Sequence, residues 1–225
     1  FKPWFDSHHQ ENFLSWVHFH DPHFPYNPPG DYAGIYKNDL YSGEVSYVDL
    51  YVGKIIKELE DKKLMDSTLI VLTGNYGEGF GEHAEYGHGV FCYEENLRVP
   101  LIFSNPVLFK EKRKISRRVG LVDVTPTLLH LFGVKTPSGI QGRSIAHWLV
   151  TGETGDIKEA SPPLYFESVY PKDEFKWAPV RGVVSDSYKY IASSEQELYN
   201  LDTDKKEKNN LITTEPERAK TMAAI

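Results

Sequence analysis

Residues 73–89, TGNYGEGFGEHAEYGHG, form the densest group of residues that could carry chemistry, with six glycines, three glutamates and two histidines. Glycines let a backbone turn tightly and approach a ligand closely. The carboxylates and imidazoles, from Glu78, Glu82, His83, Glu85 and His88, could hold a hard divalent cation. The spacing of His83 and His88 is not that of a helix-face pair, so zinc has little support. The residues alone leave open a solvated glycine-rich loop without a ligand.

A second candidate is His23, which stands between two prolines in residues 21–26, DPHFPY. The prolines restrict the backbone and hold the imidazole in place. The loop follows an apolar run at residues 13–20, and α/β proteins bind ligands in loops at the carboxyl ends of parallel strands. The alternative is a histidine that only hydrogen-bonds its own loop.

The single cysteine, Cys92, is predicted to be a buried structural thiol rather than a nucleophile. The sequence contains no G-x-S-x-G motif and no P-loop. The GEGFGEH stretch follows an apolar run, but its acidic residues would repel a pyrophosphate. No nucleotide-binding motif is therefore assigned.

Three apolar runs predict buried strands that position these loops, at residues 13–20, 67–74 and 98–106. The near-continuous run at 67–74 is typical of a parallel strand that is covered on both faces. A helix is predicted over residues 37–63 because valine, isoleucine and leucine recur there at helical spacing.

A second helix is predicted over residues 121–134, with Thr125 at its N-cap, Pro126 at its first position and Gly133 just past its end. Together these elements predict an α/β fold with a central sheet flanked by helices over residues 1–150. From about residue 160 the pattern changes to short strands with polar turns, followed by a short helix that starts near Glu215. Residues 151–225 are therefore predicted to form a small antiparallel sheet with a terminal helix.

The net charge of −7 argues against nucleic acid as a partner, because no surplus of cations neutralises phosphates. No run of 18 apolar residues is present, so no membrane span is predicted. The chain begins FKPWFDSHHQ, without an initiator methionine, and we expect it to be a fragment or a processed piece. Compartment and oligomeric state cannot be deduced from these features.

Several pieces, taken in order, resemble the C-terminal part of the catalytic domain of a sulfatase, in the alkaline-phosphatase-like superfamily. They are FLSWVHFHDPHFPYNPP, YSGEVSYVDLYVGKIIKELEDKKLMDSTLIVLTGNYGE, GHGVFCYEENLRVPLIF, LVDVTPTLLHLFGV with GIQGRSI, and YKYI with ELYNLDTDKKEKNNL. The resemblance covers residues 12–212. It implies hydrolysis of a small-molecule or glycan sulfate ester, with a formylglycine nucleophile and a divalent cation, usually calcium, that polarises the sulfate oxygens.

The resemblance assigns His23 as a substrate-binding histidine in a P-H-x-P loop, and His88 as the residue that contacts the sulfate or protonates the leaving oxygen. It places two metal ligands at Asn75 and Tyr76, where relatives have Asp followed by Asn or His. An amide oxygen lacks the carboxylate charge, and a phenol is a poor ligand at pH 7.

The chain has no C/S-x-P-x-R motif, so the formylglycine is expected upstream of it. Two alternatives stay open. The protein could be a catalytically inactive sulfatase-like binding domain, as the Asn75 and Tyr76 replacements suggest. It could also be a phosphodiesterase or phosphoethanolamine transferase of the same superfamily, in which a threonine or serine is the nucleophile.

Overall fold

The computed structural model describes residues 1–152 and 162–225. The chain forms two compact units, one of residues Phe1–Ile70 with Ser104–Leu108 and one of Val71–Phe103 with Phe109–Ile225. Helices and strands are mixed in an α/β fold. The change of sequence pattern near residue 160 falls in residues 153–161, outside the described residues, and the division at residue 150 stays a prediction.

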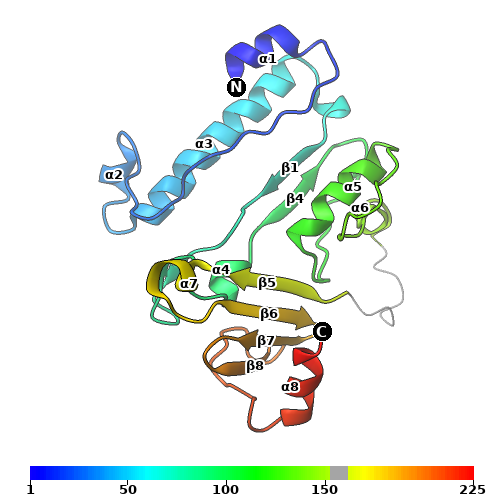
Figure 1. The fold of residues 1–225 in the computed structure, drawn as a ribbon. Helices are drawn as coiled ribbons and strands as arrows, with labels where there is room; N and C mark the ends of the chain where they lie inside the picture. Colours follow the sequence, from blue (N-terminus) through cyan, green and yellow to red (C-terminus); the bar gives the residue numbers. More distant parts are fainter. Residues whose placement is uncertain (153–161) are drawn as a thin grey trace. The chain divides into compact units, whose positions relative to one another are not determined.

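The first unit is built on α3, Leu40–Asp61, which confirms the helix predicted over 37–63 with slightly shorter ends. The Asp39 carboxylate caps it by accepting the Ser42 N–H at 3.1 Å. Helix α1, Lys2–His8, is tied to α3 by the ion pair of Lys2 with Glu58 at 2.8 Å. Figure 1 shows residues 9–31 running back along α3 to the short α2, Tyr32–Ile35.

The strand predicted at residues 13–20 is wrong for this structure. The segment is extended coil, and the side chains of Leu14 and Trp16 are both 89% exposed. A strand exists only where its N–H and C=O groups pair with a neighbour. No strand within residues 1–152 or 162–225 pairs with this segment, so its apolar pattern alone does not make it a strand.

The strands predicted at 67–74 and 98–106 are confirmed in shorter form as β1, Ile70–Thr73, and β4, Leu101–Ser104, which pair with each other. A 3-10 turn, Met65–Ser67, precedes β1. The expectation that the first strand is covered on both faces is wrong here, since its residues are only partly buried. A two-stranded sheet leaves more of each strand in contact with solvent than the interior of a wide parallel sheet does.

The helix predicted over 121–134 is a 3-10 turn, Leu121–Asp123, that continues as α5, Val124–Leu131. Its N-cap is Asp123 and not Thr125, because α5 begins at Val124. The buried Asp123 carboxylate makes no capping bond to α5 and instead accepts the Gly120 and Arg143 N–H groups at 3.0 and 2.8 Å. Pro126 is therefore the third helical residue, still within the first turn, where an N–H has no intrahelical acceptor. Gly133 follows the helix at φ 67°, as predicted, and α6, Ala146–Thr151, comes next.

The predicted antiparallel sheet is confirmed, with four strands in sequential order. They are β5, Leu164–Ser168; β6, Val180–Ser185; β7, Tyr188–Ala192; and β8, Gln196–Asn200. Helix α7, Tyr170–Phe175, connects β5 to β6, and α8, Pro216–Ala223, begins after Glu215 as expected.

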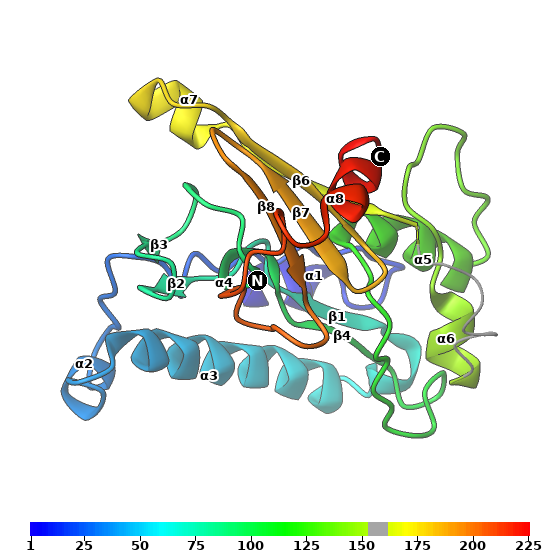
Figure 2. The ribbon, with the colours of Figure 1, turned by 90° about the horizontal axis from the view of Figure 1, so that it is seen from below.

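Each face of this sheet carries its own core. On one face Val183, Tyr190 and Leu198 pack with Ala219 and Met222 of α8. On the other face Val184, Ile191 and Tyr199 pack with Cys92, Tyr93 and Leu97, which belong to α4, Glu94–Leu97, and the segment before it. Figure 2 shows α8 beside the sheet. The sheet thus supports the segment that follows the glycine-rich loop.

Candidate active site

The glycine-rich loop folds as a small hairpin. Strands β2, Gly79–Phe80, and β3, Tyr86–Gly87, pair antiparallel, with Gly79 opposite Gly87. The Gly77 N–H donates to the Asn96 carbonyl at 2.8 Å. A Cβ at Gly77 would lie 2.0 Å from the Glu95 carbonyl oxygen, so only glycine allows this approach to α4. The hairpin is therefore fixed against α4 by its backbone.

His88 is held by two neighbours from the same loop. Its Nδ1 lies 2.9 Å from Oε1 of Glu78, and the Glu78 side chain is only 6% exposed. The ring of Tyr76 stacks on the imidazole, with centroids 4.0 Å apart. A carboxylate partner assigns the proton to Nδ1, so Nε2 is the atom at which His88 would exchange a proton with a substrate. This arrangement suits general acid–base chemistry.

The two predicted metal positions do not form a cation site by themselves. Asn75 and Tyr76 are both exposed, and the ring of Tyr76 is packed against His88. Among the described residues, no three His, Cys, Asp or Glu side chains gather where they could hold a metal ion. The donor set of the described residues therefore does not by itself fit a divalent cation, since calcium takes about six to eight oxygen ligands.

The other polar residues of the loop hold its fold together. The buried Glu85 carboxylate accepts the N–H groups of Val90 and Phe91 and an amide hydrogen of Asn96, at 2.6 to 3.1 Å. The Glu82 carboxylate accepts the Phe80 N–H at 2.6 Å, and these backbone hydrogen bonds lower its pKa. These two side chains stabilise the hairpin, and neither lies in a cluster of potential metal ligands.

His83 connects the loop to the segment that follows β8. Its Nδ1 lies 2.5 Å from Oε1 of Glu95, its Nε2 lies 3.1 Å from the Glu207 carbonyl oxygen, and its ring stacks on Tyr93 at 3.7 Å. Lys189, on β7, is fully buried and pairs with the equally buried Glu207 at 2.8 Å. The Glu207 carboxylate also accepts the Glu94 N–H at 2.6 Å.

The buried ion pair of Lys189 with Glu207 was not predicted from the sequence. A lysine between two tyrosines in a β-strand could have signalled the buried cation, but Glu207 lies in a charged tail that gives no comparable signal.

His23 lies in the first unit. The buried Glu44 carboxylate of α3 accepts the His23 and Asn27 N–H groups at 2.9 and 2.5 Å and so holds the loop. The half-buried imidazole lies 2.6 Å from the Phe24 carbonyl oxygen through Nδ1, and its ring packs against His20 at 4.4 Å. The structure places His23 in the first unit and His88 in the second.

Cys92 is buried, as predicted, with 3% of its surface exposed. Burial raises the pKa of its thiol to about 11. A thiol in this state is a poor nucleophile at neutral pH.

The fold is of the α/β class, and comparison with known proteins identifies the family. The family model described as Sulfatase matches residues 1–134, and the model described as N-sulphoglucosamine sulphohydrolase, C-terminal, matches residues 81–225. The chain belongs to the sulfatase family.

Individual relatives agree with this assignment. An N-acetylglucosamine-6-O-sulfatase of Bacteroides thetaiotaomicron is 34% identical over 178 residues, covering 76% of this chain and 31% of the relative. The uncharacterized sulfatase YidJ of Escherichia coli is 28% identical over 191 residues, covering 83% and 36%. A protein solved in complex with its substrate D-glucosamine-2-N,6-O-disulfate superimposes with a TM-score of 0.65 at 29% identity, covering 84% and 39%.

The chain thus spans about a third of the length of the curated relatives it matches, between 31% and 37%. Among the helices of residues 1–152 and 162–225, none has the length and hydrophobicity needed to cross a bilayer.

Proposed function

We propose that the protein containing this chain is a sulfatase-type hydrolase that cleaves sulfate esters of sugars. The observation that carries the proposal is the Glu78–His88 pair, at 2.9 Å, in the glycine-rich loop of a sulfatase-family chain. The net reaction converts R–O–SO₃⁻ and water into R–OH, sulfate and a proton. As the S–O bond to the sugar oxygen breaks, His88 Nε2 donates a proton to that oxygen, and Glu78 holds the imidazole through Nδ1.

A sulfated sugar is the proposed substrate because of what the relatives act on. One is an N-acetylglucosamine-6-O-sulfatase, and another was solved with D-glucosamine-2-N,6-O-disulfate. His23 is proposed to contact the sulfate from its proline-framed loop. The nucleophile, a formylglycine, is proposed to come from residues outside these 225, because no C/S-x-P-x-R motif occurs among them. Further cation ligands would come from outside as well.

The test is sulfate release from N-acetylglucosamine 6-sulfate by the whole protein, measured by ion chromatography. His88→Ala is expected to lower kcat by roughly 100-fold or more, the range for a lost general acid, and Glu78→Gln to lower it less. His8→Ala is the control, since the partly buried His8 side chain hydrogen-bonds to the Trp4 carbonyl and stacks on the Trp4 ring within α1. Turnover by His88→Ala within twofold of the parent would contradict the assignment.

A binding domain without catalysis is the second candidate, favoured by the exposed Asn75 and Tyr76 at the two positions where metal ligands are expected. It predicts that the whole protein binds the same sulfated sugar, measured by calorimetry, and releases no sulfate from it even when supplied with calcium.

A further inference from the structure

Positive charge is concentrated in one region of this acidic chain. Residues 110–150 contain eight lysines and arginines against two acidic residues, a net charge of +6, whereas the whole chain carries −7. Six of these cations lie in residues 110–118, KEKRKISRR. A local field opposite in sign to the rest of the molecule attracts anionic partners.

The structure gathers the arginines of this region around α6. The Arg113 guanidinium donates to the Val150 carbonyl, at the C-terminal end of α6, at 2.6 Å. The guanidinium carbons of Arg117 and Arg143 lie 5.1 and 4.8 Å from the centroid of the Trp148 ring. Cation–π packing of this kind holds the two guanidinium groups in place on one helix. Segments 26 residues apart in the sequence thus meet at one aromatic side chain.

Arg118 extends the same cluster. It lines a small cavity of about 40 Å³ together with Arg143 and the buried Asp123, whose carboxylate accepts two backbone N–H groups. Among the described residues, Arg113 pairs with Glu111 at 3.4 Å and Arg118 pairs with Asp202 at 4.0 Å. Both acidic side chains are more than two-thirds exposed, so solvent weakens these pairs.

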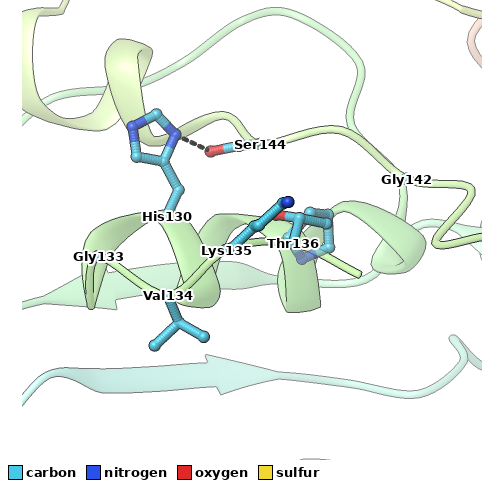
Figure 3. A pocket seen from close by; sticks show the side chains of 8 residues that line it. His130, Gly133, Val134, Lys135, Thr136, Gly142 and Ser144 are labelled. Atoms are coloured by element: carbon cyan, nitrogen blue, oxygen red, sulfur yellow. Dashed lines mark hydrogen bonds between the residues drawn. The ribbon is translucent and has the colours of Figure 1, made fainter. Parts of the chain in front are cut away.

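A pocket of about 390 Å³ opens at the end of α5, next to Arg143 in the sequence. Lys135 and His130 line it with Ser144, whose hydroxyl oxygen lies 2.9 Å from His130 Nδ1 (Figure 3). Its volume is within the range of small-ligand sites, large enough for one sugar unit. Lysine, imidazole and hydroxyl groups are all able to donate hydrogen bonds to an anionic oxygen.

We propose that this basic face, formed by Arg113, Arg117, Arg118, Arg143 and Lys135 with the lysines of residues 110–114, binds a sulfated polysaccharide. Guanidinium groups bind the oxygens of an oxyanion in a bidentate manner, and a sulfate ester stays charged at every physiological pH. Placing like charges together is unfavourable, and a polyanion offsets that repulsion.

The choice of a sulfated polymer rests on the proposed function, in which the protein hydrolyses sulfate esters of sugars. The basic face is formed by elements other than the Glu78–His88 hairpin, so it can bind one part of a polymer while another part reacts. Binding of this kind raises the local concentration of the ester groups at the reacting site.

The experiment measures the Kd of the whole protein for heparin, a sulfated polysaccharide, at several salt concentrations. The test variant is Lys112→Gln/Lys114→Gln/Lys135→Gln. Its three lysines are exposed and form no ion pair with a described residue, so the variant removes charge without removing a structural contact. The matched control is Lys205→Gln/Lys206→Gln/Lys220→Gln, which removes three exposed lysines elsewhere.

The test variant is expected to bind heparin at least tenfold more weakly, with a shallower dependence of Kd on salt, and the control less than twofold more weakly. Equal weakening in both variants, or none in the test variant, would overturn the proposal. So would equal competition by double-stranded DNA or by the unsulfated polyanion hyaluronan, since the site would then recognise charge alone.

Hydrolysis of the monosaccharide ester N-acetylglucosamine 6-sulfate separates this proposal from the proposed function. If the parent protein releases no sulfate but binds heparin through the basic face, the proposed function fails and the binding site stands.

Discussion

At the scale of single residues, the loop that follows β1 contains the side chain proposed to act on a substrate, His88, and side chains that hold the loop. Glu78 and Tyr76 both contact His88, one by a hydrogen bond and one by stacking. Glu85 is buried, and its carboxylate accepts hydrogen bonds from the backbone N–H groups of residues 90 and 91. The sequence showed these residues as one polar set, and only the three-dimensional arrangement divides them.

A carboxylate at position 75 in place of Asn75 is expected to strengthen calcium binding. In the whole protein, Asn75→Asp adds a carboxylate at an exposed loop position, and calcium prefers charged oxygen ligands. The variant is expected to bind calcium more tightly than the parent, measured by isothermal titration calorimetry and by the metal content after purification. Asn38→Asp, which adds the same charge at an exposed position before α3, is the control. Equal affinities in parent and Asn75→Asp would show that residue 75 is no ligand.

Cys92 gives a prediction for alkaline pH. Burial raises the pKa of its thiol from 9.0 to about 11, so the unfolded chain releases this proton at lower pH than the folded chain. The stability this provides is complete below pH 9 and is lost as pH rises to 11, a loss of about 2 to 3 kcal/mol. Urea denaturation of the parent and of Cys92→Ala from pH 8 to 11 should show a shallower decline in the variant.

The comparison with Cys92→Ala is needed because burial also raises the pKa of Tyr93 and of Tyr199, which lie in the same core. Those tyrosines titrate in both proteins, so their effect cancels in the difference. Parallel curves for the two proteins would contradict the raised thiol pKa.

At the scale of elements, the sequence predicted most where local signals and packing agree. Helix α3 has apolar spacing and an Asp39 cap, and the antiparallel strands after residue 162 alternate between two cores. Predictions from the sequence were wrong where the local structure depends on residues distant in the sequence or on the preceding turn. The apolar run at residues 13–20 has no paired strand among the described residues. The 3-10 turn at Leu121–Asp123 leads directly into α5, so the helix begins at Val124, before the predicted cap Thr125. The spacing of apolar residues in the sequence shows neither the missing partner strand nor the start of the helix.

The ion pair of Lys189, on β7, with Glu207, in the segment after β8, gives a prediction for stability at the scale of elements. Lys189→Met leaves the Glu207 carboxylate buried without its cation, so the free energy of unfolding should fall by about 3 to 5 kcal/mol. Lys189→Met/Glu207→Gln should recover most of the loss, because a neutral amide still accepts the Glu94 N–H. Urea denaturation measures both, with the exposed Lys205→Met as control. An equal loss in the single and double variants would mean that Lys189 matters through packing alone.

At the scale of the whole molecule, the family assignment and the length of the chain must be considered together. The chain covers about a third of each curated relative, and within it the candidate acid–base group is present while a formylglycine motif is not. A site of this kind works only when every group is assembled around one sulfate. The 225 residues alone are therefore expected to release no sulfate from N-acetylglucosamine 6-sulfate, whereas the whole protein is expected to release it.

The same reasoning sets the expected roles of two histidines in the first unit. In the whole protein, His23→Ala should lower kcat/KM for N-acetylglucosamine 6-sulfate by roughly tenfold or more, since a lost contact to a charged group is worth about 1.5 to 3 kcal/mol. His8→Ala should change it less than twofold, because the His8 side chain contacts Trp4 in its own helix and no proposed site residue. Circular dichroism should show both variants folded, since Glu44 holds the His23 loop through backbone N–H groups that alanine keeps. Equal kinetic effects would remove His23 from the site, and a large effect of His23→Ala with no effect of His88→Ala would place the acid–base chemistry on the first unit instead.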